Sequence, residues 1–254
     1  MRDVEITVFE EPELTNPIFI EGLPGVGNVG KLAADHLIQE LKAKRFAEMH
    51  SKYFPPQVLV LPDGTIRLVN NEFYYHKSKK PGTPDVVILI GDYQGLTADG
   101  QYALVDTVLE FVKKFGVRTI YTLGGYGTGK IADKPRVLGA ATQKELVKEM
   151  KKHGVVFRKN EPGGGIVGAS GLLLGLGAKR GFEGVCLMGE TSGYLVDPKS
   201  AQSVLEILGK ILNAEIDFRD LETRAEQMDK LAQQLRDLEK SAEGPTDEDL
   251  RYIG

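Results

Sequence analysis

Short apolar segments rich in β-forming residues alternate with longer segments of helical periodicity, from the N-terminus to about Asn213. This alternation is typical of βαβ units, in which helices cover the faces of a sheet that contains parallel strands. The expected strands are residues 4–9, 18–21, 58–61, 65–69, 86–90, 119–123, 137–141, 155–158 and 184–188. The expected helices are residues 28–44, 99–115, 143–153, 166–176, 198–212 and 217–242.

The strands expected at residues 58–61 and 65–69 are separated only by Pro62, Asp63 and Gly64. These residue types favour a tight turn, because proline fixes φ, aspartate accepts a local hydrogen bond and glycine tolerates positive φ. The pair is therefore predicted to form a β-hairpin. The sequence predicts an α/β fold with a mixed, mainly parallel sheet flanked by helices, followed by a C-terminal helical appendage.

The composition changes after Asn213, which suggests a core domain at 1–213, a C-terminal helix at 214–242 and a flexible tail at 243–254. Apolar residues of the helix recur at alternating four- and three-residue steps, the a/d spacing of a coiled-coil seam. They are Leu221, Ala225, Met228, Ala232 and Leu235. Such a stripe either packs on the chain's own core or pairs between subunits. We expect Leu221, Met228 and Leu235 to be oligomer contacts, and the glycine-rich segment 163–177 is a second candidate contact.

Charge and composition exclude several classes of protein. With 32 basic and 36 acidic residues the net charge is -4, so the chain offers no excess positive charge to a nucleic acid. No apolar run approaches the roughly 18 residues that a membrane span needs, and the first residues do not form a signal peptide. Cys186 is the single cysteine, as expected of a protein from a reducing compartment. We therefore expect a cytoplasmic protein without a membrane or nucleic-acid partner. Many Lys and Glu residues and the lack of Trp suggest a thermophile.

A glycine-rich turn follows the strand expected at residues 18–21. Gly25, Gly27 and Gly30 match the G-x-G-x-x-G spacing that brings a pyrophosphate to a helix N-terminus. A dinucleotide site also needs a second parallel strand and an acidic ribose ligand about 20 residues further on, but residues 46–50 lead into an aromatic and proline-rich stretch, 53–56. We expect a packing turn and no cofactor, with a dinucleotide site as the alternative.

Further glycines and polar residues follow three other expected strands. Gly91-Asp92, Leu123-Gly124-Gly125 and Gly189-Glu190-Thr191 stand where open α/β sheets place their ligands, at the carboxyl ends of strands. Asp92, Glu190 and Thr191 are therefore candidates for a small-molecule pocket. The alternative is that the glycines form tight turns and the polar residues cap the following helices. The four histidines lack metal-ligand spacing, and no nucleophile elbow is present, so we expect no metal site and no catalytic residue.

Taken together, the segment Gly22–Gly30 and the three strand ends described above resemble the archaeal homologues of the proteasome assembly chaperone 2 family. The resemblance covers about residues 1–240. It implies a fold similar to that of purine nucleoside phosphorylases, homo-oligomerisation, and a chaperone-like role in assembling or binding proteasome components.

The tail bears on that role. Proteasome-binding relatives end in a hydrophobic residue, a penultimate tyrosine and one last residue, whereas Tyr252 here is third from the end and follows Arg251. Leu250, Tyr252 and Ile253 are the large apolar residues of an otherwise polar segment, and we expect them to bind a partner, either proteasome subunits or another assembly factor. The alternative is that they dock on a neighbouring subunit and close the oligomer.

These features favour a non-enzymatic, homo-oligomeric assembly chaperone or adaptor that uses its C-terminal helix and tail for protein contacts. The alternative is a nucleotide- or nucleoside-binding enzyme, phosphorylase-like or ligase-like, with its site at the glycine-rich sheet edge. A scaffold unrelated to proteasomes is a third hypothesis.

Overall fold

A computed structural model describes residues 3–157 and 165–242. The strands are β1 (Val4–Val8), β2 (Ile18–Gly22), β3 (Lys44–Ser51), β4 (Val58–Val60), β5 (Ile66–Leu68), β6 (Asn71–His76), β7 (Val86–Gly91), β8 (Thr119–Gly127), β9 (Val137–Ala141) and β10 (Glu183–Thr191). The α-helices are α1 (Val29–Leu41), α2 (Ala98–Lys113), α3 (Lys144–Lys152), α4 (Ala169–Lys179), α5 (Pro198–Leu212) and α6 (Arg219–Ala242), and a short 3₁₀ turn (Val26–Asn28) precedes α1.

The main sheet has the strand order β1-β3-β6-β7-β2-β8-β10-β9. Its central strands β7, β2, β8 and β10 are parallel to one another. The pairs on either side, β1–β3, β3–β6, β6–β7 and β10–β9, are antiparallel. The structure confirms the predicted α/β fold with a mixed sheet, and the parallel pairing is confined to the centre.

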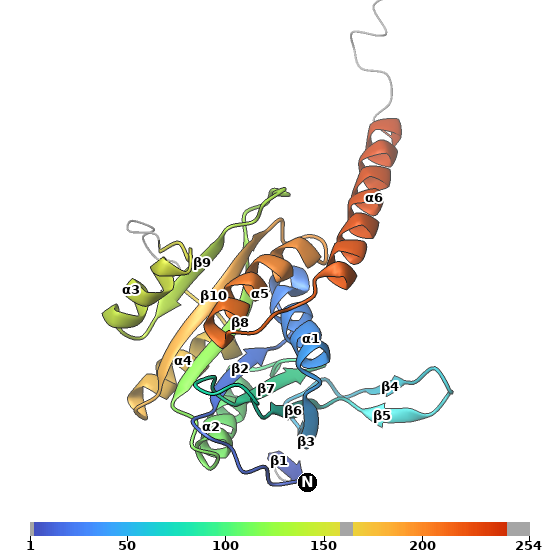
Figure 1. Cartoon of the computed structure of the whole chain (residues 1–254). Helices are drawn as coiled ribbons and strands as arrows, with labels where there is room; N and C mark the ends of the chain where they lie inside the picture. Colours follow the sequence, from blue (N-terminus) through green and yellow to red (C-terminus); the bar gives the residue numbers. More distant parts are fainter. Residues whose placement is uncertain (1–2, 158–164, 243–254) are drawn as a thin grey trace, which may run out of the picture.

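Helices cover both faces of this sheet (Figure 1). Helices α1 and α5 pack on one face, α2 and α4 pack on the other, and α3 lies beside β9. The α2 face holds an aromatic cluster in which the rings of Phe46, Phe73 and Phe111 are in mutual contact. Because both faces are covered, β7 is buried along its whole length, as expected of a strand in the parallel centre of a sheet.

Two strands of the main sheet were not predicted from the sequence. Strand β3 was missed because its sequence, KRFAEMHS, mixes charged residues with good helix formers. Strand β6 follows the hairpin closely and alternates buried with half-buried side chains. Both strands pair antiparallel on one side of the sheet, and these pairs, together with β9, make the sheet mixed.

Several predicted bounds need correction. The predicted strand 155–158 is wrong over its described part, where Val156 forms only an isolated bridge to Leu138. Helix α1 ends before the predicted residue 44 because Lys42 adopts a left-handed φ of 51°. Helix α4 starts three residues later than predicted, since Gly168 has a φ of 84° that a helix does not accommodate. The prediction for α5 is confirmed, with Asp197 as the N-cap and Pro198 in the first turn.

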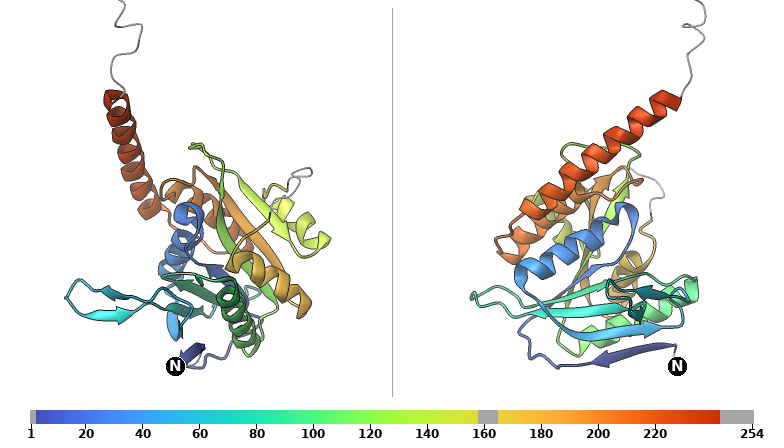
Figure 2. Two further views of the ribbon diagram at one scale, coloured as in Figure 1. Left: turned by 180° about the vertical axis from the view of Figure 1, so that it is seen from behind. Right: turned by 90° about the vertical axis from the view of Figure 1, so that its right-hand side faces the viewer.

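The predicted hairpin is present, but it forms a separate two-stranded sheet, β4–β5, that extends from the body (Figure 2). Its outer face carries the apolar side chains. Val58, Val60, Ile66 and Leu68 are all exposed. On the other face, Leu59 packs against the core, and the guanidinium of Arg67 binds Asp92. The hairpin therefore turns its charged side chain toward the body and its apolar side chains outward.

Helix α6 is fixed to the core at its first turns. The linker before it is held by α1, where His36 Nε2 lies 2.7 Å from the carbonyl oxygen of Asp217. Leu221 and Ala225 are buried, 1% and 6% exposed, and α6 packs along α5. Beyond this contact the helix extends away from the core (Figures 1 and 2). The apolar stripe thus packs on its own chain in its first half.

Candidate functional site

Four neighbouring parallel strands bring their carboxyl ends to one edge of the sheet. These strands are β7, β2, β8 and β10. The predicted glycine-rich segments lie here, but two of them belong to strands rather than turns, because β8 continues to Gly127 and β10 to Thr191 in unbroken parallel register. The glycine-rich ends of β8 and β10 and the glycine-rich turn after β2 therefore lie side by side.

The glycines allow backbone segments to approach closely. A Cβ at Gly30 would lie 2.2 Å from the carbonyl oxygen of Leu123, and a Cβ at Gly22 would lie 2.4 Å from that of Gly30. A Cβ at Gly125 would lie 2.2 Å from the carbonyl oxygen of Val26. Real Cβ atoms do not approach this closely, so glycine at these positions is required for the packing of α1 onto β2 and β8.

This packing occupies the place of a pyrophosphate. Gly27, with a φ of 61°, faces the side chain of Thr191, and its carbonyl accepts a hydrogen bond from the backbone of Asp197 at 2.9 Å. Strand β3, which follows α1, is not a neighbour of β2, because β6 and β7 lie between them. It therefore cannot supply the ribose ligand of a dinucleotide fold. Gly27 and Gly30 are thus explained by packing of the protein against itself, whereas no atom lies within 4 Å of the Cβ position of Gly25.

Asp92 is engaged by an arginine from the hairpin. Arg67 donates to both carboxylate oxygens, at 2.6 and 2.9 Å, and the backbone N–H of Asn70 donates to Asp92 Oδ2 at 3.0 Å. Burial opposes ionisation of Asp92, but these hydrogen bonds outweigh it and hold its pKa below the usual value. The carboxylate thus anchors β5 to the carboxyl end of β7.

Glu190 is likewise paired. Arg136 donates from Nε to Glu190 Oε2 at 2.8 Å and from Nη2 to Oε1. The backbone carbonyl of Glu190 accepts from the Ser200 hydroxyl, and that of Thr191 accepts from the backbone N–H of Thr128 at 2.8 Å. The side chains of Glu190 and Thr191 do not cap the following helix. Thr97 caps α2, and Asp197 caps α5.

A buried carboxyl group, which the sequence analysis missed, lies below this edge. Glu21 is fully buried in β2 and accepts from the Leu23 N–H at 3.0 Å and from the Ser170 hydroxyl at 2.8 Å. Burial raises the pKa of Glu21 to about 7, and the two hydrogen bonds only partly oppose the effect. The signal in the sequence was a lone glutamate in an otherwise apolar strand, IFIEG.

Strand register places Glu21, Thr122 and Cys186 in one row across β2, β8 and β10. Cys186 is buried, and burial raises the pKa of its thiol to about 12. A thiol that holds its proton so tightly is a poor nucleophile and a poor metal ligand. Over the described residues no three His, Cys, Asp or Glu side chains are placed to hold a metal ion.

Gln94 joins two of the loops at this edge. Its side-chain oxygen accepts from the backbone N–H of Ala169 at 3.0 Å, which caps α4, and its amide nitrogen donates to the Pro24 carbonyl at 2.8 Å. The polar groups of the edge are thus used to bind the loops to one another.

Between residues 3 and 242, leaving aside 158–164, no helix is both long and apolar enough to cross a membrane.

Several large apolar side chains at this edge are exposed to solvent. Large exposed side chains stand on the loops after β2, β7, β8 and β10 and just before α4. They are Val26, Leu96, Ile131, Val167, Tyr194 and Val196, and we call them the apolar rim. These apolar side chains stand among exposed charged ones on the same loops, whereas Glu21 beneath them is buried.

The residues that were predicted to bind partners have different surroundings. Leu221 belongs to the core of its own chain and is not exposed for an oligomer contact. Met228 is half-buried where α6 passes Ile131 and Val196. The side chain of Leu235, and Leu250, Tyr252 and Ile253 in the tail, lie outside the described residues.

The sequence of the chain matches the model of the PAC2 family over residues 19–236. The chain belongs to the PAC2 family. An uncharacterized protein of Methanocaldococcus jannaschii is 44% identical to it over 247 residues, which are 95% of this chain and 93% of the relative. The family match confirms the resemblance inferred from the glycine segments.

The solved structures of two Pyrococcus furiosus proteins are similar to this chain over almost their whole length. PbaB, described as an archaeal proteasome activator, has a TM-score of 0.88 and 45% identity, and the match covers 93% of this chain and 100% of PbaB. PbaA, an archaeal homolog of proteasome-assembly chaperone, has a TM-score of 0.76 and 30% identity, with 95% and 94% covered. This PAC2 protein therefore has proteasome-related homologues.

The glycine contacts predict a contrast between two substitutions in this PAC2 protein. Gly30→Ala should lower the free energy of unfolding by about 3 kcal/mol, because the new methyl group would overlap the Leu123 carbonyl. Gly25→Ala should change it by less than about 0.5 kcal/mol, since no atom lies within 4 Å of its Cβ position. Urea denaturation measures both. Equal stabilities of the two variants would contradict the packing role of Gly30.

Glu21 predicts a pH dependence of stability. Its pKa is about 7 in the folded protein against an ordinary value of 4.5, so the folded state binds the proton more tightly than the unfolded state. Its contribution is then fully present below pH 4.5 and is lost as the pH rises through 7. Relative to wild type, Glu21→Gln should gain about 3 kcal/mol between these limits.

Urea denaturation at closely spaced pH values measures this difference, and Glu222→Gln, on the exposed surface of α6, is the matched control. A Glu21→Gln curve that runs parallel to wild type across the whole range would show that Glu21 titrates normally.

Proposed function

We propose that this PAC2 protein is a non-enzymatic, homo-oligomeric adaptor that binds proteasome subunits through its C-terminal helix and tail. The observation that carries the proposal is the match to PbaB, described as an archaeal proteasome activator, over the full length of PbaB at 45% identity. Identity of this extent over a whole chain favours a shared kind of partner.

The shape of the molecule supports the proposal. Only the first turns of α6 are packed, and its second half extends from the core (Figure 1). From residue 226 onward the side chains that the structure describes are exposed, except for the half-buried Met228. A helix that leaves its own core in this way is available to another subunit or to a partner protein.

The sheet edge supports a binding role over an enzymatic one. The glycine segments are filled by their own protein backbone. Asp92 and Glu190 are each neutralised by an arginine, and Glu21 is sealed beneath the surface. An enzyme of the phosphorylase or ligase type would need polar groups that converge on an open pocket. The apolar rim instead favours contact with a second protein surface.

The proposal predicts an oligomer in solution. Light scattering at micromolar concentration should give a mass several times the 27.8 kDa of the chain, because the apolar rim and the free half of α6 need cover. Leu231→Asp, which places a charge on the unpacked half of α6 where Leu231 is 43% exposed, should lower that mass. Leu231→Ala is the milder control. A monomeric wild-type protein would contradict the homo-oligomer.

The tail predicts a loss of partner binding upon deletion. Proteasome core particles from the same organism should be retained by the immobilised protein, and deletion of residues 250–254 should reduce this retention strongly, because it removes Leu250, Tyr252 and Ile253. The matched control is a tail of full length with Asp247→Asn, which keeps the apolar residues.

The oligomer mass and melting temperature of the deletion variant should match those of wild type. If the full-length protein retains no core particles, the proposed partner is wrong. If the deletion dissociates the oligomer, the tail is required to hold the subunits together, and the assignment of its role to the proteasome is wrong.

A further inference from the structure

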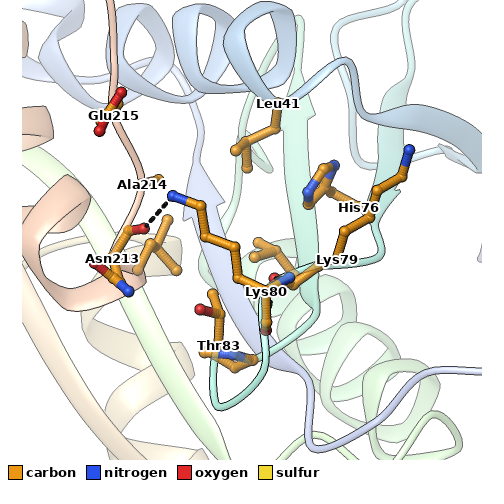
Figure 3. Close-up of a pocket in the computed structure, with 12 residues that line it drawn as sticks. Leu41, His76, Lys79, Lys80, Thr83, Asn213, Ala214 and Glu215 are labelled. Carbon is orange, nitrogen blue, oxygen red and sulfur yellow. Dashed lines mark hydrogen bonds between the residues drawn. The ribbon is translucent and has the colours of Figure 1, made fainter.

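A pocket opens at the opposite edge of the sheet from the apolar rim, beside the linker between α5 and α6 (Figure 3). Its volume is about 270 Å³, enough for one or two large apolar side chains. Leu41 of α1, Val86 of β7 and Leu212 of α5 form its apolar walls. The hydroxyl of Thr83, another lining residue, is buried without a hydrogen-bond partner. The pocket is therefore mainly apolar, with one unsatisfied polar group.

The mouth of this pocket is basic. Lys79 and Lys80, from the loop between β6 and β7, line it together with His76, against the single acidic side chain of Glu215. Figure 3 shows Lys80 reaching across to the linker, where its Nζ donates to the carbonyl oxygen of Asn213 at 3.2 Å. Three further lysines, Lys42, Lys44 and Lys77, are close in the sequence to residues that line the pocket. Within the described residues no ion pair involves any of the five lysines.

A chain of net charge -4 that gathers unpaired lysines around an apolar pocket is complementary to an acidic, apolar peptide. The chain itself contains such a peptide outside the described residues. Asp247, Glu248 and Asp249 immediately precede its apolar residues Leu250, Tyr252 and Ile253. The acidic run would face the lysines while an apolar side chain enters the pocket.

Chain length decides which copy supplies this peptide. The pocket lies at the start of α6, and the 24 residues of that helix carry the chain about 36 Å away from it at 1.5 Å per residue. From Ala242 to Leu250 an extended chain reaches about 27 Å. Leu250 and the acidic run before it therefore cannot return to the pocket of their own chain. A peptide whose acidic run faces these lysines must come from a neighbouring molecule.

We propose that this pocket is the docking site for segment 246–253 of a second copy of the chain. An antiparallel arrangement of two α6 helices would bring each tail to the other copy's pocket. The site goes beyond the proteasome-binding function and does not depend on it, because both halves of the contact belong to this chain. A tail docked in this way is withheld from any other partner.

Cysteine cross-linking of the full-length chain tests the docking. Protein with Lys79→Cys is mixed with protein of larger, tagged mass that carries Ile253→Cys, and the mixture is mildly oxidised without proteasome. The native Cys186 is fully buried and does not interfere. We expect a mixed disulfide-linked dimer whose yield is several-fold higher than with Lys113→Cys, an exposed lysine of α2 on the opposite face of the sheet, in place of Lys79→Cys.

Neutralising the acidic run with Asp247→Asn, Glu248→Gln and Asp249→Asn should reduce the mixed dimer several-fold, and so should high salt. Equal yields from Lys79→Cys and Lys113→Cys would overturn the site. If the neutralised run gives the same yield of mixed dimer as the native sequence, the proposed recognition by charge is wrong. If both cysteines in one chain give only an internally linked monomer, the assignment to a second copy is wrong. Because no proteasome is present, failure here is distinct from failure of the proposed function.

Discussion

The contact of α1 with the centre of the sheet is the constraint on which the rest of the structure depends. Gly30 allows the helix backbone to rest on the carbonyl oxygen of Leu123 in β8, and Gly22 accommodates the helix from β2 below. With α1 held so close, α5 packs beside it, and the linker to α6 is fastened by His36. The position of α6 thus depends, through α1, on glycine at positions 22 and 30.

The sequence predicted the parallel centre of the sheet better than the antiparallel strands β3 and β6, for a physical reason. Strands buried on both faces, such as β7, must be continuously apolar and are recognised from composition. Strand β3, which lies between β1 and β6, leaves several of its side chains exposed or half-buried. It accepts lysine, arginine and glutamate there, so that its sequence does not differ from that of a helix. Helix α5 was predicted to the residue because Asp197 and Pro198 mark its start.

The candidate site was predicted in position but not in character. Glycines and carboxylates did gather at the carboxyl edge, yet the partner of each carboxylate comes from a distant part of the chain. Arg67 binds Asp92, Arg136 binds Glu190, and Ser170 binds Glu21, 149 residues away. Such pairings depend on the tertiary structure and leave no local pattern. A carboxylate after a strand therefore indicates a site, but the fold determines whether it faces a ligand or an arginine.

Helix α6 also acts as a spacer of defined length. The first part of α6 is packed on α5 and held by the ion pair between Lys199 and Asp229. The distance between the core and the end of the helix therefore depends on the number of residues in α6. A helix is far stiffer than an irregular chain, and each residue adds 1.5 Å to its length. Insertions or deletions in α6 would therefore shift the last turn of the helix along its axis in steps and rotate it by about 100° per residue. The length of α6 sets how far its last turn lies from the core and in which direction that turn faces, and it is therefore under a geometric constraint of its own.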